Sequence, residues 1–209
     1  IKEKVKDCEV VALSLGPRKA QEVLRTSIAM GVDRVALLET ERYGIVDPSY
    51  TAKILSGFAK KEGFDVILCG ERAMDDENGI VGALVAEYLK VPFIGSVTKI
   101  EVKDKGKITA SSEIDGGHFT YEVDLPAVLS LRKGINEPRV PNVTGVMKAM
   151  RTQIPSYDPS SFGVFSPKTE IVGYHSPGKS PPVKIIEGQT PEEKVKKLVS
   201  LLKEEAKVI

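Results

Sequence analysis

Three apolar runs, each followed by a segment with helical spacing, constrain the fold of this chain most strongly. Residues 9–15 (EVVALSL), 34–38 (RVALL) and 64–69 (FDVILC) are short and almost continuously apolar. Such runs are typical of parallel strands that are buried on both faces. The segments that follow them place apolar residues three or four positions apart, as amphipathic helices do. This alternation predicts an α/β fold, with a parallel sheet and helices on both of its faces.

Residues with strong end preferences mark the limits of these helices. Pro17 opens the first predicted helix and Gly31 ends it. Asp47 and Pro48 form a capped start for the second, which ends at Gly63. Aspartate favours the N-cap, proline the first turn and glycine the position after the last turn.

The pattern changes after Pro92. Residues 96–124 alternate between polar and apolar, with turn signals at 104–106 and 115–117, which predicts an antiparallel excursion containing a β-hairpin. The chain returns through a buried strand over residues 125–131, followed by a loop over 132–139. A short helix is predicted over residues 143–150.

The last quarter of the chain predicts an extended arm that ends in a helix. Residues 153–182 are rich in Pro, Ser and Gly, and such stretches usually cross a partner or stay flexible. Thr190, Pro191 and Glu193 then form a capping box before an apolar stripe. We expect an α/β domain over residues 1–152 and an arm over 153–209. The terminal helix docks either on its own sheet or on a partner subunit, which the arm would wrap.

The first residues of the chain have the pattern of an internal segment of a fold. Residue 1 is Ile rather than Met, and residues 1–15 suggest the end of a charged helix running into a buried strand. We therefore expect that an N-terminal strand and helix precede this sequence.

Composition narrows the function classes. The 30 Lys and Arg residues nearly balance 29 Asp and Glu, which argues against a nucleic acid ligand. No apolar run approaches the roughly 20 residues of a membrane span, so direct membrane insertion is not expected. Cys8 and Cys69 form no disulfide framework, and buried, reduced thiols in a reducing compartment are expected. With His118 and His175 as the only histidines, no metal site is expected.

One nucleotide-binding pattern must be set aside. Residues 173–180 (GYHSPGKS) match the P-loop consensus. However, Pro177 removes a backbone donor inside the loop, and Pro181 and Pro182 oppose the helix that a P-loop requires. We therefore do not expect a phosphate site there.

The segment from Gly70 to Val81 is the better candidate for a ligand site. It follows a buried parallel strand and leads to a helix start, where ligands bind in open α/β sheets. Gly79 and Gly82 permit close backbone approach, and free amides at the helix start could hold a phosphate. The acidic run 75–77 has two interpretations: it caps the helix, or Asp75 or Asp76 accepts hydrogen bonds from ribose hydroxyls.

No catalytic constellation is evident. The chain lacks a nucleophile elbow, His118 lies in a predicted hairpin, and His175 has no clear carboxylate partner. This pattern favours binding or electron carriage over covalent catalysis.

Together these segments resemble the β subunit of electron transfer flavoproteins over essentially the whole chain. The resemblance rests on residues 13–17 and the helix ending at 28–31, the loop 70–82, residues 114–117 leading to 125–128, Asn136-Glu-Pro-Arg139, Met147-Lys-Ala149, and Pro181-Pro182 before a capped helix. It implies a flavodoxin- or Rossmann-like, adenine-nucleotide-binding fold.

The resemblance also implies cofactors and partners. In that family an α subunit holds FAD, the β subunit covers part of it, and the β subunit binds AMP itself. Flavin dehydrogenases would be transient donors, and a membrane quinone oxidoreductase or another protein the acceptor. The expected location is the cytoplasm, or the mitochondrial matrix in a eukaryote. The implied nucleotide-binding residues are Leu15, Gly70, Glu71, Arg72, Ala73, Met74, Asp75, Asp76, Asn78, Gly79, Ile80 and Val81.

Two features leave AMP and a second FAD as alternatives. AMP-binding members often have Thr where this chain has Val81, whereas electron-bifurcating members, which carry a second FAD, tend to have Val. Bifurcating members also tend to carry an acidic-Arg-x-Phe-x-Gly-x-Asp-Thr run after the second strand, which residues 41–47 (ERYGIVD) match poorly. We favour AMP on this basis.

The same resemblance predicts a loop that docks on dehydrogenases. It lies within residues 139–150, with Val143 as the apolar anchor. The alternative is that Val143 and Val146 pack the short helix onto the sheet. The expected docking residues are Arg139, Val143, Val146, Met147 and Lys148.

Overall fold

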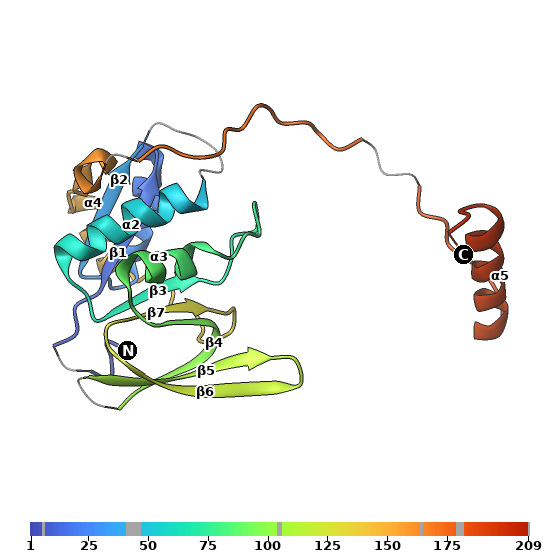
Figure 1. Cartoon of the computed structure of the whole chain (residues 1–209), viewed down its shortest axis with the longest axis horizontal. Coiled ribbons are helices and arrows are strands. Elements are labelled where there is room, and N and C mark those ends of the chain that lie inside the picture. The colour runs from blue at the N-terminus through green and yellow to red at the C-terminus, as the bar shows by residue number, and fades with distance from the viewer. Residues whose placement is uncertain (6, 41–46, 104–105, 164, 179–181, 209) are drawn as a thin grey trace. The chain divides into compact units, whose positions relative to one another are not determined.

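The three apolar runs form the predicted strands β1 (Val11–Gly16), β2 (Arg34–Glu39) and β3 (Val66–Gly70) in the computed structural model (Figure 1). The structure describes residues 1–5, 7–40, 47–103, 106–163, 165–178 and 182–208. Two compact units contain these residues, Ile1–Ile171 and Val172–Ile209. None of the described helices combines the length and the apolar character needed to cross a membrane.

The strands of the first unit form two hydrogen-bonded sheets. One has the order β1-β2-β8, with β8 at Ser156–Tyr157, and all its pairs are parallel. The other has the order β3-β7-β4-β5-β6. In it β7 (Ala127–Leu131) lies parallel to both β3 and β4 (Phe93–Val102). The open α/β architecture is confirmed, with a mixed rather than purely parallel second sheet.

Helices cover both faces of the first sheet, as the continuous burial of β2 from Val35 to Leu38 requires. On one face, Leu37 packs with Leu24 and Ile28 of α1 (Gln21–Ala29), which follows a short turn η1 (Arg18–Ala20). On the other face, Leu38 packs with Ile54 and Phe58 of α2 (Pro48–Glu62). Leu37 and Leu38 are fully buried, because successive side chains of a strand point to opposite faces.

Helix α2 also packs beside α3 (Val81–Leu89), and Figure 1 shows the two adjacent to each other. Leu55 of α2 packs against the core of the first sheet and against the cluster of Ala52, Val85 and Val128. This shared helix layer joins the two sheets.

The predicted antiparallel excursion is present. β4 pairs with β5 (Lys107–Ile114), and β5 pairs with β6 (Gly117–Asp124) in a continuous ladder. The hairpin turn consists of Asp115 and Gly116, with Gly116 at a φ of 83° that favours glycine. Residues 104–105 of the other predicted turn lie outside the described residues.

Residues 153–171 belong to the first unit, although the sequence places the domain boundary at 152. Ile154 is buried, β8 pairs with β2, and the short helix η2 (Pro159–Phe162) packs on α2. The approach is close, since a Cβ on Gly57 would lie 2.6 Å from the Phe162 carbonyl oxygen. These contacts join residues far apart in sequence, which local composition does not reveal.

The second unit contains the predicted terminal helix α5 (Pro191–Glu204). Thr190 caps it by accepting a hydrogen bond from the Glu193 amide at 3.3 Å, and Glu193 accepts one from the Gln189 amide at 3.0 Å. No residue of α5 is buried, and Val195, Leu198 and Val199 are exposed. Residues 172–178 have no regular structure. Residues 179–181, which include the last two positions of the P-loop-like segment, lie outside the described part of the chain.

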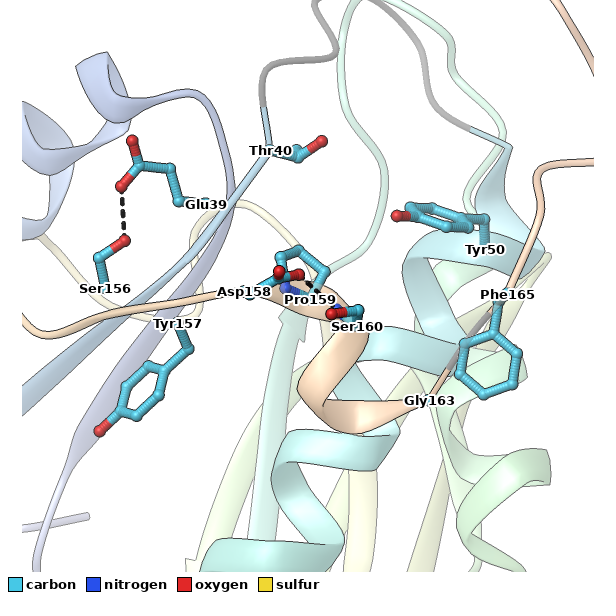
Figure 2. A pocket seen from close by; sticks show the side chains of 10 residues that line it. All are labelled: Glu39, Thr40, Tyr50, Ser156, Tyr157, Asp158, Pro159, Ser160, Gly163 and Phe165. Carbon is cyan, nitrogen blue, oxygen red and sulfur yellow. Dashed lines mark hydrogen bonds between the residues drawn. The ribbon is translucent and has the colours of Figure 1, made fainter.

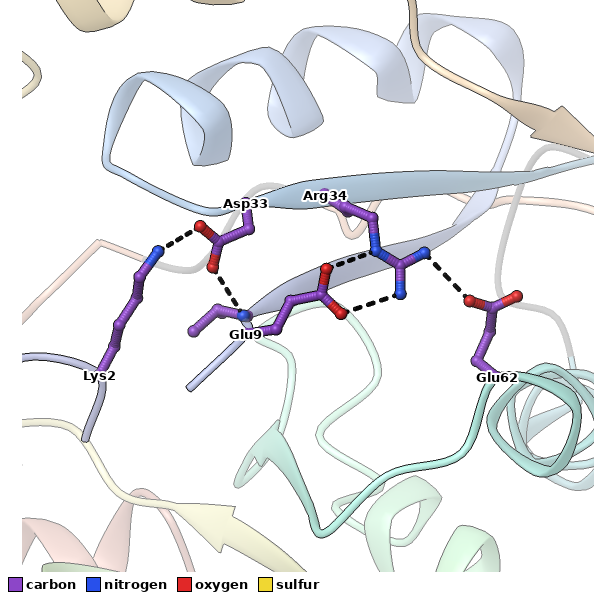
Figure 3. A network of polar contacts seen from close by, with 6 residues as sticks. Lys2, Glu9, Asp33, Arg34 and Glu62 are labelled. Carbon is purple, nitrogen blue, oxygen red and sulfur yellow. Dashed lines mark hydrogen bonds and ion pairs between the residues drawn. The ribbon is translucent and has the colours of Figure 1, made fainter. Parts of the chain in front are cut away.

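Ion pairs connect the start of β1, the start of β2 and the end of α2, at the edge of the sheet opposite the carboxyl ends of its strands (Figure 3). Arg34 at the start of β2 forms a bidentate pair with Glu9 at 2.8 and 3.1 Å, and a third bond to Glu62 at 3.1 Å. Lys2 pairs with Asp33, whose other oxygen accepts a hydrogen bond from the Val10 amide at 2.8 Å. The Arg34 guanidinium lowers the pKa of Glu9.

Candidate functional site

The loop after β3 lies at the carboxyl edge of the parallel strands, where ligands bind in open α/β sheets. Gly70 ends β3 and is paired with Leu131, the last residue of β7. The Glu71 amide donates to the Leu131 carbonyl at 3.0 Å. Ten residues later the chain enters α3 at Val81. The predicted binding residues from Gly70 to Val81 therefore lie in one connection at the carboxyl edge of the second sheet.

Among the residues that the structure describes, no side chain caps the start of α3, whereas Asp47 caps α2 and Asn142 caps α4 (Val143–Arg151). The acidic run bonds within the loop instead. Asp75 accepts from the Asp76 amide at 3.0 Å, and Asp76 accepts from the Asn78 amide at 3.2 Å. The structure shows no capping hydrogen bond from this acidic run to α3, and the bonds of Asp75 and Asp76 stay within the loop.

Gly79 and Gly82 each have a local physical role. Gly79 has a φ of 62°, and a Cβ there would lie 3.4 Å from the Glu71 carbonyl oxygen. A Cβ on Gly82 would lie 3.2 Å from the Phe93 ring and 3.8 Å from the Cys69 sulfur. The two glycines let the loop close on itself and let α3 begin close to β3.

Most side chains of the loop are exposed to solvent, whereas Glu71 and Asp76 are half-buried. Met74 is 98% exposed and Ile80 is 46% exposed. Cys69 lies beneath the helix start, and burial raises the pKa of its thiol. Both Cys69 and Cys8 are free thiols and half-buried. The other exposed loop residues are Arg72, Ala73, Asp75, Glu77, Asn78 and Gly79.

Leu15 belongs to the first sheet, whereas this loop follows a strand of the second sheet. It lies near the end of β1, in the first sheet, and packs against the cluster of Leu38, Ile54 and Phe58 beneath α2. Its side chain therefore contributes to the core.

A cavity of about 530 Å³ lies at the carboxyl end of β2, away from the predicted loop (Figure 2). Glu39 and Ser156 lie on one side, joined by a 2.5 Å hydrogen bond, and Tyr50 and Phe165 on another. Sequence reasoning missed it because residues 156–165 were assigned to the arm. Asp158 followed by Pro159, a capped helix start, was the available signal.

The predicted docking segment contains helix α4 (Val143–Arg151), which packs mainly on α1. Gly145 makes this possible, since a Cβ there would lie 2.5 Å from the Ala29 carbonyl oxygen. Ala149 is buried on the same side. Arg25 of α1 donates to the Thr152 carbonyl at 3.1 Å just past the end of α4.

The other side of α4 is apolar and exposed. Val143 is 75% exposed, and Val146 and Met147 are also exposed. Met147 and Lys148 line a hollow of about 450 Å³. The alternative in which Val143 packs the helix onto the sheet does not agree with its exposure. Arg139 lies before the helix and pairs with Glu3.

A family model described as "Electron transfer flavoprotein domain" matches residues 1–161. The chain belongs to the electron transfer flavoprotein family. It is 36% identical to "Electron transfer flavoprotein subunit beta" of Megasphaera elsdenii, over 76% of this chain and 61% of that protein. It is 32% identical to the protein of the same name from Bacillus subtilis, over 96% of this chain and 79% of that protein.

Another relative in this family has a different name. "Caffeyl-CoA reductase-Etf complex subunit CarD" of Acetobacterium woodii is 32% identical over 98% of this chain and 80% of its own length. The chain thus spans between 61% and 80% of the length of these three relatives.

Proposed function

We propose that this chain is the β subunit of a heterodimeric electron transfer flavoprotein and acts as a non-catalytic electron carrier. It binds AMP at the loop from Gly70 to Val81 and helps to enclose FAD held by an α subunit. Flavin dehydrogenases donate the electrons, and a membrane quinone oxidoreductase or another protein accepts them. The observation that carries the nucleotide assignment is the start of α3, which none of the described side chains caps.

The chemistry of the loop suits a nucleotide phosphate. The first-turn amides of α3 and the positive end of its helix dipole attract an anion. Gly79 allows backbone to approach a ligand without a side chain in the way. We assign the exposed Asp75 carboxylate the role of accepting a hydrogen bond from a ribose hydroxyl. FAD supplies the electron-carrying group when bound, while this chain binds, orients and shields.

The second candidate is an electron-bifurcating β subunit that holds a second FAD in place of AMP. Val81, the first residue of α3, carries this alternative because it offers no hydroxyl to a phosphate. The relative from a caffeyl-CoA reductase complex belongs to the same family. The run at residues 41–47 bears on this choice, and residues 41–46 lie outside the described part of the chain.

We also propose that α4 is the docking element. Its outer side offers an exposed apolar anchor, Val143, and the helix also carries the exposed cationic Lys148. Apolar centres with polar rims are the usual anatomy of protein interfaces. The exposed apolar stripe of α5 suits the α subunit as a second contact.

The decisive experiment counts the nucleotides released by denaturing the intact αβ complex. One FAD and one AMP per heterodimer supports the carrier. Two FAD and no AMP overturns the carrier in favour of the bifurcating subunit. One FAD with no second nucleotide rejects the assignment of the loop as a nucleotide site.

A further inference from the structure

Ser96 and Glu71 are joined across the carboxyl edge of the second sheet. The Ser96 hydroxyl donates a 2.7 Å hydrogen bond to Glu71 Oε1, and both residues are half-buried. The sheet register explains how they meet. Gly70 pairs with Leu131, and Leu131 pairs with Val97, so Glu71 and Ser96 flank one line across three strands.

The backbone at Ser96 departs from regular strand geometry. Its φ is 51°, a left-handed value that a non-glycine residue adopts at a cost, and the pairing of β4 with β7 shifts register between Ile94 and Val97. β-Bulges often re-aim a side chain beside a functional site. Here the bulge accompanies a hydroxyl that bonds to Glu71.

Glu71 lies where the loop leaves the sheet. Its amide bonds to β7, and its carbonyl oxygen lies where a Cβ on Gly79 would approach to 3.4 Å. The other side-chain hydrogen bonds of the loop remain within it. The Asp76 amide donates to Asp75, and the backbone and side-chain nitrogens of Asn78 donate to Asp76. Among the described residues, Ser96 to Glu71 is the only side-chain hydrogen bond that connects residues 71–80 to the rest of the protein.

We propose that Ser96 is a positioning residue for this loop. Its hydroxyl holds the Glu71 carboxylate, which sets where the loop leaves the sheet and where residues 71–80 lie relative to the start of α3. The inference rests on the proposed nucleotide function for its effect on affinity. It does not need that function for its effect on the order of the loop.

The test uses Ser96→Gly in the intact αβ complex. Glycine accepts the left-handed φ, so the variant removes the CH2OH side chain, and with it the hydrogen bond to Glu71, without straining the bulge. Ser112→Ala is the matched control, because Ser112 donates to the Gly95 carbonyl at 2.6 Å in the same bulge and, among the described residues, makes no hydrogen bond to the loop. The readouts are amide hydrogen exchange of residues 72–80, AMP affinity by calorimetry, and the melting temperature.

Hydrogen bonds to charged groups are typically strong enough for an effect of about tenfold. We expect Ser96→Gly to speed exchange in residues 72–80 and to weaken AMP binding about tenfold each, without a lower melting temperature. Ser112→Ala should lower the melting temperature and leave the loop unchanged. If Ser96 had only a structural role, Ser96→Gly would lower the melting temperature and leave loop exchange and AMP affinity unchanged.

Two results would overturn the proposal: unchanged loop exchange in Ser96→Gly, or equal loosening of the loop in Ser112→Ala. If the wild type binds no AMP but Ser96→Gly still speeds loop exchange, the positioning role stands and the proposed nucleotide function fails. If the wild type binds AMP and Ser96→Gly changes neither exchange nor affinity, the positioning role alone is rejected.

Discussion

Asp47 Oδ2 accepts a 2.6 Å hydrogen bond from the backbone amide of Lys168, 121 residues further along the chain. Its other oxygen accepts from the Ser49 amide at 2.7 Å and so caps α2. The residue is 6% exposed. The bond to the Lys168 amide is the main reason that the pKa of Asp47 lies below its ordinary value, and the Ser49 bond adds to it.

Replacing Asp47 with Ala should lower the free energy of unfolding by about 1–2 kcal/mol, the usual range for loss of a helix cap. The Lys168 amide would also lose its acceptor. Urea denaturation measures the change. Asp158→Ala is the control, since Asp158 caps only the four-residue η2 by accepting from the Ser160 amide. An equal loss in the two variants would contradict a special role for Asp47.

Asp47 should also give the protein a defined acid sensitivity. Its folded pKa is below the ordinary value of 3.8, so its stabilising contribution is complete above that value. The contribution is lost as the pH falls through the lower, folded pKa. Denaturation midpoints measured from pH 5 to pH 2 should fall less steeply in Asp47→Asn than in the wild type.

Asp33 and Glu9 (Figure 3) also have lowered pKa values, because Lys2 and Arg34 bond to them. Both are exposed pairs that salt screens. Repeating the acid titration in high salt separates them from Asp47. A slope difference between the wild type and Asp47→Asn that disappears in salt would assign the effect to the surface pairs.

Gly145→Ala should push α4 away from α1. The added Cβ would meet the Ala29 carbonyl oxygen at 2.5 Å, and overpacking of this kind typically costs about 1–3 kcal/mol. Chemical denaturation checks the loss. Gly117→Ala offers a comparison at a position where a Cβ meets nothing within 4 Å. If both variants lose the same stability, the close approach of α4 to α1 is not the cause.

Val143→Asp should slow electron transfer from a flavin dehydrogenase at least about tenfold, the effect expected when an interface anchor is lost. Because Val143 is 75% exposed, the melting temperature should not change. Stopped-flow reduction of the αβ complex measures the rate. Val23→Asp, on the exposed side of α1 and itself 65% exposed, should behave as the wild type. Equal rates for the two variants would move the docking site elsewhere.

Helix ends were the most predictable part of this fold. Asp47 with Pro48, Gly63, and Thr190 with Pro191 each mark a helix limit that the structure confirms. Capping depends on residues within one turn of each other, so a local sequence contains the needed information.

The candidate site was predicted in its position but not in its internal bonding. The loop after β3 was expected from strand and helix order, yet the acids there were as consistent with capping as with ligand binding. Their carboxylates turned out to bond within the loop. The cavity lined by Glu39 and Ser156 was not predicted, because those residues are separated by 117 positions.

The sequence by itself determined the α/β alternation, the hairpin, the helix limits and the edge of the sheet on which the loop lies. Each depends on periodicity or on neighbours within a few residues. Only the tertiary structure decided that β8 pairs with β2, that Lys168 bonds to Asp47, and that Ser96 reaches Glu71. These contacts depend on strand register and chain closure, which bring distant residues together and leave no local pattern.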